Sequence, residues 1–350
     1  MDKQIVSMHI GSGEITVVSA HWARGGEYVL DGFYRTGAKG LREGVVTDTN
    51  EAIDSIARSL NGIRGRTGIK FREVYTGITS PSVDMMPAMG DVLLSKYGRE
   101  INPGDMKKCV EMGSVIKLPL ERESLHKLVS EFYVDGEKGI KNPVNLEAVK
   151  LGVKINIITI RSNILNNLIK CINMAGYLSS GFVLSGLASS YRTLTQEDKN
   201  EGAALIRISK EITEILFFNK GVMTNCKVLA KGADNIMASD NTINEDVLGE
   251  LTSRIRQYPE WKQTKRIVLT GEGSMYEGML ESWESSLNSP VKIGNCLARP
   301  FENLPEDRMG YIVSLGILDH LYREKQQNRL ANNLINGAFY RVTGFIDKYF

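Results

Sequence analysis

The pattern of apolar and polar residues predicts two β-hairpins. At the N-terminus, the apolar segments 5–10 and 15–20 flank a short turn that contains glycine. Farther along, the apolar segments 204–208 and 214–218 enclose the polar stretch 209–213. Other short apolar runs predict strands at 74–78, 151–158 and 266–269. The second hairpin lies where a new domain is expected to begin, near residue 202.

Helices are predicted where apolar residues recur at helical spacing. The segment 50–60 carries its apolar residues on one face and has Thr49 or Asn50 as its N-cap. Further helices are predicted at 105–112, 163–175 and 245–258. Strands and helices therefore follow one another along most of the chain, as in an α/β protein.

The last part of the chain has a different character. From Arg323 it is basic and polar, which predicts an exposed linker or a helical stem. Residues 330–350 then form a helical pattern with one broad apolar face and cations at its margin, as a helix lying in a membrane interface requires. The residues expected to contact lipid are Leu334, Ile335, Phe339, Arg341, Val342, Phe345, Ile346, Lys348, Tyr349 and Phe350. The alternative is a helix packed on its own domain or on a second subunit.

Composition and charge exclude several classes of protein. The 350 residues can form two or more domains, and 42% hydrophobic with 24% charged residues is ordinary for a globular protein. The net charge of +2, with basic residues spread along the chain, argues against a nucleic-acid partner. The four cysteines are far apart and form no Cys-x-x-Cys pair, so neither zinc nor disulfides are predicted and a reducing cytoplasm is expected. We expect no signal peptide and no transmembrane helix.

Three segments of the sequence resemble the bacterial cell-division protein family FtsA, a branch of the actin-like ATPases. The segment 37–49 has the family's order of glycine, leucine, basic residue, glycine, valine and aspartate, and the segments 115–143 and 152–202 are also similar. Matching positions in the inserted subdomain are Leu125, His126, Phe132, Val134, Asp135, Gly139, Ile140, Asn142 and Pro143. The resemblance covers nearly the whole chain and implies an α/β, actin-like fold of two ribonuclease-H-like lobes with an FtsA-type inserted subdomain.

The resemblance also implies a division of the chain. The first lobe is expected at 1–79 and 160–201, the inserted subdomain at 80–159, the second lobe at 202–322, and the linker with the C-terminal amphipathic helix at 323–350. Between residues 234 and 245 there is no room for the outer subdomain that the family carries in its second lobe. In FtsA that subdomain binds the tubulin-like protein FtsZ, so its expected absence argues against FtsZ as a partner.

By the resemblance, three turns form a nucleotide cleft, here with altered residues. The candidate binding residues are Gly11, Ser12 and Gly13, then Ser209, Lys210 and Thr213, and finally Gly271, Glu272 and Gly273. The alternative is that these glycines have only a structural role and permit tight turns, with positive φ in the first of them. His126 is interpreted as a packed residue because no partner for catalysis is evident. We predict no catalytic residue and no metal site.

The resemblance implies lost nucleotide chemistry, because His9 and Arg207 stand where the family has acidic residues. Mg²⁺ prefers oxygen ligands, which neither side chain offers, and Glu272 adds a negative charge where phosphates would lie. No cofactor is therefore predicted, and ATP with Mg²⁺ is expected only if the altered cleft still binds them. Arg207 and Lys210 have two interpretations: they hold an anion without metal, or they pair with Glu211 and Glu214 in a solvated surface cluster, which is favoured.

The function implied is that of a membrane-associated adaptor or scaffold in bacterial cell division or the cytoskeleton. It is expected on the inner face of the cytoplasmic membrane as a non-hydrolysing pseudo-ATPase that polymerises there. The predicted partners are anionic lipid, other copies of the chain, and division or cytoskeletal proteins. One alternative is a nucleotide-switched ATPase with Glu211 or Glu214 as magnesium ligands. Another is an adaptor for pilus or secretion assembly.

Overall fold

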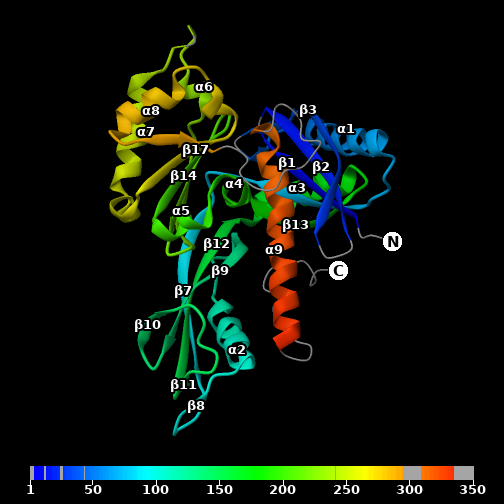
Figure 1. Ribbon diagram of the computed structural model, residues 1–350. Coiled ribbons are helices and arrows are strands. Elements are labelled where there is room, and N and C mark those ends of the chain that lie inside the picture. The colour runs from blue at the N-terminus through cyan, green and yellow to red at the C-terminus, as the bar shows by residue number, and fades with distance from the viewer. Residues whose placement is uncertain are drawn as a thin grey trace.

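The computed structural model describes residues 4–11, 13–23, 27–42, 44–240, 242–294 and 309–334, with side chains described up to residue 326. Two lobes lie beside each other, and a smaller subdomain extends below them (Figure 1). A long helix, α9 (Ile312–Leu334), runs from the region between the lobes toward the level of this subdomain (Figure 1). The arrangement is the two-lobed α/β fold expected from the sequence.

The first lobe is built on a five-stranded sheet with helices on both faces. The strand order is β13-β6-β1-β2-β3, in which β1, β2 and β3 are antiparallel and β1, β6 and β13 are parallel. Its elements are β1 (Gln4–Ile10), β2 (Glu14–Trp22), β3 (Tyr28–Gly37), β4 (Leu41–Arg42), β5 (Val45–Val46), α1 (Thr49–Thr67), β6 (Glu73–Ile78), α3 (Ser162–Met174), β13 (Leu178–Leu184) and α4 (Ser185–Thr193). Val6 and Met8 of β1 belong to the core under α1 and α3, whereas Ile5 packs with Leu315 of α9 on the other face.

The second lobe repeats the same topology. Its sheet has the order β16-β15-β14-β17-β18, again with an antiparallel hairpin meander followed by parallel strands. Its elements are α5 (Gln196–Glu201), β14 (Ala203–Ile208), β15 (Thr213–Asn219), β16 (Val222–Leu229), α6 (Ala233–Ile236), α7 (Glu245–Gln257), a 3-10 helix (Pro259–Gln263), β17 (Arg266–Thr270), a second 3-10 helix (Glu272–Met275), α8 (Met279–Leu287) and β18 (Val291–Ile293). Each lobe therefore has a strand-turn-strand hairpin at the same place in its sheet.

The two faces of β14 have different neighbours. Ala204 and Ile206 pack in the core beneath α7 and α8, whereas Leu205 belongs to the large core that also includes first-lobe residues. Side chains alternate across a strand, so Arg207 lies on the same side as Leu205, toward the first lobe. Because of this alternation, the charged side chain of Arg207 extends toward the first lobe.

The inserted subdomain is a four-stranded antiparallel sheet with one helix packed on it. The strand order is β10-β9-β12-β7, and a small two-stranded sheet pairs β11 with β8. Its elements are β7 (Asp84–Leu93), β8 (Arg99–Glu100), α2 (Pro103–Ser114), β9 (Arg122–Val134), β10 (Glu137–Ile140), β11 (Glu147–Ala148) and β12 (Lys150–Arg161). The helix begins in a capping box in which Asn102 and Asp105 exchange side-chain to backbone hydrogen bonds, which stabilises its first turn.

Helix α9 belongs to the core of the first lobe. The side chain of Arg192 on α4 is fully buried, and its Nε lies 2.5 Å from Oδ2 of Asp319 on α9. The Tyr28 hydroxyl accepts a hydrogen bond from Arg192 at 2.6 Å and donates one to Asp319 Oδ1 at 2.7 Å. Gly316 lets the helices touch, because a Cβ there would lie 2.0 Å from the carbonyl oxygen of Ala188.

Several sequence expectations need correction. The N-cap of α1 is Asp48, whose carboxylate accepts from the Glu51 N–H, so neither Thr49 nor Asn50 fills that position. Residues 312–322 were expected in the second lobe, but α9 packs on α4 and on strands of the first lobe. Of the two interpretations given for the segment from Arg323, the helical stem holds for residues 323–334, which continue α9.

Other expectations concern the residues predicted to contact lipid, the cysteines and membrane-spanning helices. Of the residues expected to contact lipid, Leu334 ends α9, and the other nine lie outside the described residues. Cys109, Cys171 and Cys226 are free thiols in the described part of the chain, and Cys296 lies outside it. Among the helices described, none has an 18-residue stretch apolar enough to cross a bilayer.

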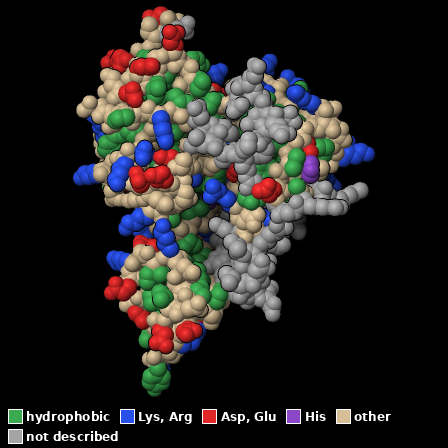
Figure 2. All heavy atoms as spheres, in the orientation of Figure 1, with side chains coloured by type: hydrophobic (Ala, Val, Ile, Leu, Met, Phe, Trp, Pro, Cys, Tyr) green, Lys and Arg blue, Asp and Glu red, His purple; other side chains and the backbone are tan. Residues whose placement is uncertain are grey.

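Figure 2 shows acidic and basic side chains on both the upper and the lower parts of one face, with hydrophobic side chains between them. A binder of phosphate backbones needs cations gathered on one surface. On the coloured part of this face, acidic and basic side chains are interspersed.

Candidate functional site

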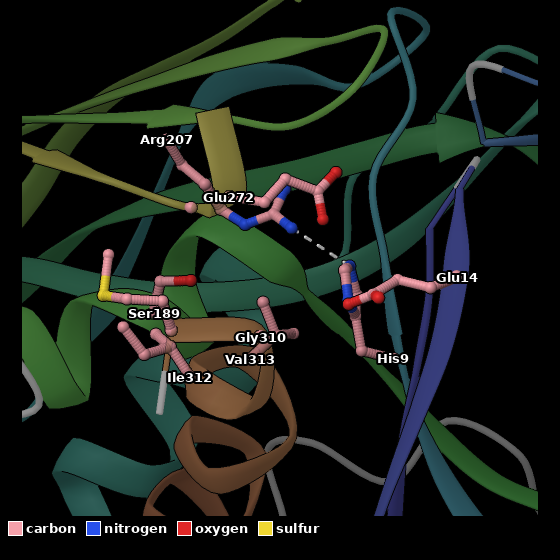
Figure 3. A pocket seen from close by; sticks show the side chains of 10 residues that line it. His9, Glu14, Ser189, Arg207, Glu272, Gly310, Ile312 and Val313 are labelled. Atoms are coloured by element: carbon pink, nitrogen blue, oxygen red, sulfur yellow. Dashed lines mark hydrogen bonds between the residues drawn. The ribbon is translucent and has the colours of Figure 1, made fainter. Parts of the chain in front are cut away.

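The two hairpin turns face each other between the lobes. His9 is the second-last residue of β1, and Arg207 is the second-last residue of β14. Because the two sheets have the same topology, these residues occupy equivalent positions in the two lobes. A hydrogen bond joins them across the cleft, with 3.2 Å between Arg207 Nη2 and His9 Nε2 (Figure 3).

Arg207 is held by the hairpin that carries it. Its direct partner on β15 is Glu214, and Arg207 Nη1 donates to Glu214 Oε2 at 2.8 Å. Arg207 is 4% exposed and Glu214 is fully buried. A buried charge needs a partner of opposite sign, and here the hairpin register supplies it.

Glu214 also reaches the helix that connects the lobes. Its Oε1 accepts a hydrogen bond of 2.9 Å from the N–H of Gly186, the second residue of α4. The helix has no side-chain cap from its own N-cap residue, so Glu214 binds a backbone donor left free at the helix start. A Cβ at position 186 would lie 2.4 Å from Leu216 Cδ1, which explains the glycine.

His9 is neutral in this setting. Burial, and secondarily the charge of Arg207, hold the pKa of His9 well below its ordinary value of 6.5. A neutral imidazole has one acceptor nitrogen, which Nε2 supplies to the Arg207 guanidinium. The buried set of Arg207, Glu214 and His9 therefore carries no net charge.

The turn of the second lobe is occupied by groups of the protein itself. Glu272 Oε1 accepts the backbone N–H of Lys210 at 2.9 Å. The Lys210 side chain extends toward the first lobe, because a Cβ at Gly13 would lie 3.2 Å from its Cδ. A backbone N–H in such a turn is the kind of donor that binds phosphate, and here a carboxylate accepts its hydrogen bond.

The remaining residues predicted for the cleft have local roles. Ser209 Oγ donates to the carbonyl of Ile212, and Thr213 Oγ1 donates to that of Lys231. Gly271 has φ 87°, and a Cβ there would lie 2.4 Å from the carbonyl oxygen of Ile208. Gly273 packs on the side chain of the same isoleucine. These residues close the turns tightly on β14.

The first turn differs from the expectation of positive φ. Gly11 does not adopt a left-handed φ, and its N–H donates to the carbonyl of Glu14 at 3.0 Å. Ser12 lies outside the described residues. Lys210 lies beside Gly13 of the first lobe and bonds to Glu272, and whether any of the candidate residues binds nucleotide stays a prediction.

A small polar pocket remains beside the Arg207 and His9 pair. The space open to a water-sized sphere in it is only about 10 Å³, far below the roughly 300–1,000 Å³ of ligand pockets in general. It is lined by His9, Glu14, Ser189, Arg207, Gly271, Glu272, Met309, Gly310, Ile312 and Val313, most of them labelled in Figure 3. Glu14, Ser189 and the start of α9 were not predicted from the sequence, because only the folded chain brings them to the cleft.

These residues do not fit Mg²⁺ with a nucleoside triphosphate. Of the carboxylates lining the pocket, Glu272 accepts the N–H of Lys210, and Glu14 pairs with Arg35 at 3.3 Å. Arg207 would repel a metal ion at the position between the lobes. Within the described part of the chain, no group of three His, Cys, Asp or Glu residues is placed to hold a metal.

Of the charged cluster expected on the surface, Arg207 and Glu214 prove to be buried. The favoured interpretation paired Arg207 and Lys210 with Glu211 and Glu214 in solvent. Instead, the Arg207 and Glu214 pair lies inside the protein, because both faces of β14 and β15 are covered. Lys210 is exposed and lies 4.0 Å from Asp234.

His126 is a packed residue, as its apolar neighbours suggested. It is 2% exposed, and its Nε2 accepts the N–H of Leu184 at 3.0 Å. Burial, with the charge of His320 second, lowers its pKa to about 3. The ring joins β9 of the inserted subdomain to β13 of the first lobe.

The duplicated sheets and the cleft between them define an actin-like ATPase fold. A solved structure titled "PilM-PilN type IV pilus biogenesis complex" aligns with a TM-score of 0.64 and 16% identity, covering 91% of this chain and 99% of that one. The ethanolamine utilization protein EutJ from Carboxydothermus hydrogenoformans aligns with a TM-score of 0.52 and 11% identity, covering 91% and 90%. At these identities the likeness concerns the fold alone.

Sequence comparison relates the chain to a particular family. The family described as "SHS2 domain inserted in FTSA" matches residues 84–159. The cell division protein FtsA of Borreliella burgdorferi is 26% identical over 381 aligned residues, covering 92% of this chain and 91% of that protein. The FtsA proteins of Pseudomonas aeruginosa and Bacillus subtilis are 25% and 28% identical, but the chain spans only 56% and 52% of their lengths. The resemblance to the FtsA family predicted from the sequence is confirmed.

Proposed function

We propose that the protein is a membrane-associated, actin-like adaptor of bacterial cell division that works without hydrolysing ATP. The observation that carries this proposal is the buried set of Arg207, Glu214 and His9 between the lobes. Phosphoryl transfer depends on a metal and on donors directed at the phosphates. The cleft has a guanidinium where the metal would lie, and a carboxylate accepts the hydrogen bond of a backbone donor.

The role in division rests on the relatives. The cell division proteins FtsA of Borreliella burgdorferi and Pseudomonas aeruginosa match 92% and 67% of the chain, and the family described as "SHS2 domain inserted in FTSA" matches residues 84–159. We propose self-association and contact with division or cytoskeletal proteins on this basis. The short connection between α6 and α7 supports the expectation that FtsZ is not the partner, because the family's docking subdomain would lie there.

Attachment to the inner face of the cytoplasmic membrane rests on the sequence pattern of residues 335–350. Helix α9 leads directly into this segment and is fixed to the first lobe by the buried contact of Arg192 with Asp319. A lipid-binding segment after α9 would therefore be tied to a rigid part of the protein. Anionic lipid is the expected surface because Arg341 and Lys348 flank the apolar face.

Calorimetry with Mg·ATP tests the nucleotide part of the proposal. We expect no heat of binding at micromolar protein, and no release of phosphate over hours. Binding in the micromolar range together with turnover would favour the alternative of a nucleotide-switched ATPase. Electron microscopy on anionic lipid with and without ATP then tests whether filaments form and whether nucleotide changes them.

Flotation with anionic liposomes tests the membrane part. Phe339→Glu with Phe345→Glu places two charges on the apolar face, and Asn336→Glu with Thr343→Glu places the same charges on the polar face. We expect the first pair to abolish flotation and the second to weaken it only modestly, as does added salt. Equal loss in both pairs, or flotation of a chain ending at Leu334, would argue against this anchor. Co-purification with pilus proteins in place of division proteins would favour a pilus adaptor.

A further inference from the structure

The contact between Arg207 and His9 spans the two lobes at equivalent positions of the duplicated fold. His9 belongs to the β1 sheet and Arg207 to the β14 sheet, 198 residues away. The partner strands next to them are also equivalent, since His9 lies beside Gly77 of β6 and Arg207 beside Thr270 of β17. The bond therefore joins the two lobes at equivalent positions on the two sides of the cleft.

A second link crosses the same region. Glu214 belongs to the second lobe, and its acceptor bond from the Gly186 N–H reaches the helix that follows β13 of the first lobe. One guanidinium and one carboxylate thus join β14 and β15 to β1 and α4. Opening the lobes at this point would break the Arg207 to His9 bond and expose a charge that is now 4% exposed.

The turn of the second lobe beside Arg207 is also occupied by groups of the protein. The carboxylate of Glu272 accepts the hydrogen bond of the Lys210 N–H, and the aliphatic part of Lys210 lies against Gly13 of the first lobe. A bound nucleotide would have to displace both groups. The protein therefore supplies a cation that joins the two lobes and an anion that occupies a backbone donor within the turn of the second lobe.

We propose that Arg207 and Glu272 form a built-in substitute for a bound metal and phosphate. Arg207 holds the two lobes closed through its bond to His9 in the absence of any nucleotide, and Glu272 occupies, within the second lobe, the backbone donor that a phosphate would bind. This inference rests on the proposed function and deepens it, because it states how the lobes keep a fixed relation without ATP. A fixed relation is useful to an adaptor, since surfaces contributed by both lobes keep one geometry. His9 serves as a neutral acceptor, so its replacement should loosen closure without disturbing the second lobe.

Pulsed electron spin resonance between labels on the two lobes measures this directly. Cysteines introduced at the exposed residues Arg64 of α1 and Glu281 of α8 carry the labels, in full-length protein with Cys296→Ser. The cysteines at 109, 171 and 226 are buried and react poorly with labels. Without nucleotide, the wild-type chain is expected to give one narrow distance distribution, and Mg·ATP should not shift it.

Two variants test the cause of closure. Arg207→Met should broaden the distribution and move it to longer distances. His9→Leu removes only the acceptor in the first lobe and leaves the Arg207 and Glu214 pair intact, so it answers the question even if Arg207→Met fails to fold. Lys231→Met breaks an exposed ion pair with Glu250 within the second lobe and should leave the distribution unchanged.

The role of Glu272 has its own measurement. Glu272→Ala frees the N–H of Lys210 and removes a negative charge, so we expect it to bind pyrophosphate several-fold more tightly than the wild-type chain in calorimetry without metal. Equal affinity would overturn the assignment of Glu272. Unchanged distances in both Arg207→Met and His9→Leu would overturn the assignment of Arg207, even if calorimetry and flotation support the proposed function. A shift of the wild-type distances on adding Mg·ATP would overturn the substitute as a whole.

Discussion

Removing the charge of Asp319 tests whether α9 is fixed to the first lobe by electrostatics. Asp319→Asn keeps the size of the side chain but leaves the guanidinium of Arg192, which is fully buried, without its anion. Breaking a buried ion pair from one side costs about 3–5 kcal/mol, because the remaining charge is desolvated and unpaired. We expect the free energy of unfolding to fall by that amount.

Separate variants can measure the contributions of the Tyr28 hydroxyl and of the ion pair to stability. Tyr28→Phe removes one hydroxyl that accepts from Arg192 and donates to Asp319, while the ion pair itself remains. A lost hydrogen bond to charged groups costs roughly 1.5–3 kcal/mol, so this variant should be milder than Asp319→Asn. The double variant Arg192→Met with Asp319→Leu removes both charges and is expected close to wild-type stability.

Urea unfolding followed by circular dichroism gives these values, with Lys231→Met as the control. The control breaks an exposed pair and should change stability by about 0–1 kcal/mol. Thermal midpoints offer a second measurement, with a loss of roughly 4–7 °C for Asp319→Asn. If Asp319→Asn costs no more than the control, or if the double variant costs as much as the two single losses added, the network does not hold α9 in the way described.

Three further predictions concern other buried groups. Gly186→Ala should lower the free energy of unfolding by about 1–3 kcal/mol, because the new Cβ would lie 2.4 Å from Leu216 Cδ1. Gly249→Ala in α7 is the control: its Cβ meets nothing within 4 Å, so it should raise the free energy of unfolding by about 0.4–1 kcal/mol. Burial lowers the pKa of His126 to about 3, below its unfolded value, so stability is lost as the pH falls through 6.5, by about 2 kcal/mol at pH 5. His126→Gln should reduce the total loss between pH 7 and 5 by about that amount in urea titrations, because His9 contributes a separate loss of the same sign. Burial, with the charge of Arg323 second, lowers the pKa of Lys199 to about 7, so the wild-type chain should gain about 2 kcal/mol between pH 7 and 9 and Lys199→Met should not.

The apolar pattern predicted much of the fold because it reports burial directly. The helix expected at 163–175 is α3 (Ser162–Met174), and the hairpin segments at 204–208 and 214–218 lie within β14 and β15. Local spacing determines such elements, and so they can be read without tertiary contacts. Asp48 was missed as the cap of α1 because Thr49 and Asn50 are equally good caps in isolation.

The burial of the site could not be read from the same pattern. Arg207 and Glu214 look like surface charges in a list of residues, and exposed pairs are the commoner case. The observed hairpin register makes these two residues direct cross-strand partners in strands that are buried on both sides, whereas the predicted segments 204–208 and 214–218 place Ile208 opposite Glu214. What no local pattern contains is that α4 and β1 cover them, because those contacts join distant parts of the chain.

The neutrality of the buried set links the residues at the two equivalent positions. Glu214 already balances Arg207, so a carboxylate at position 9 would leave a net negative charge in a buried place, and an arginine there would leave a positive one. A histidine solves this because burial beside a cation holds it neutral, and its Nε2 still accepts the second guanidinium bond. His9 and Arg207 are therefore physically coupled. Because Glu214 already balances the buried cation of the second lobe, a neutral acceptor such as His9 fits opposite it in the first lobe without leaving an unbalanced buried charge.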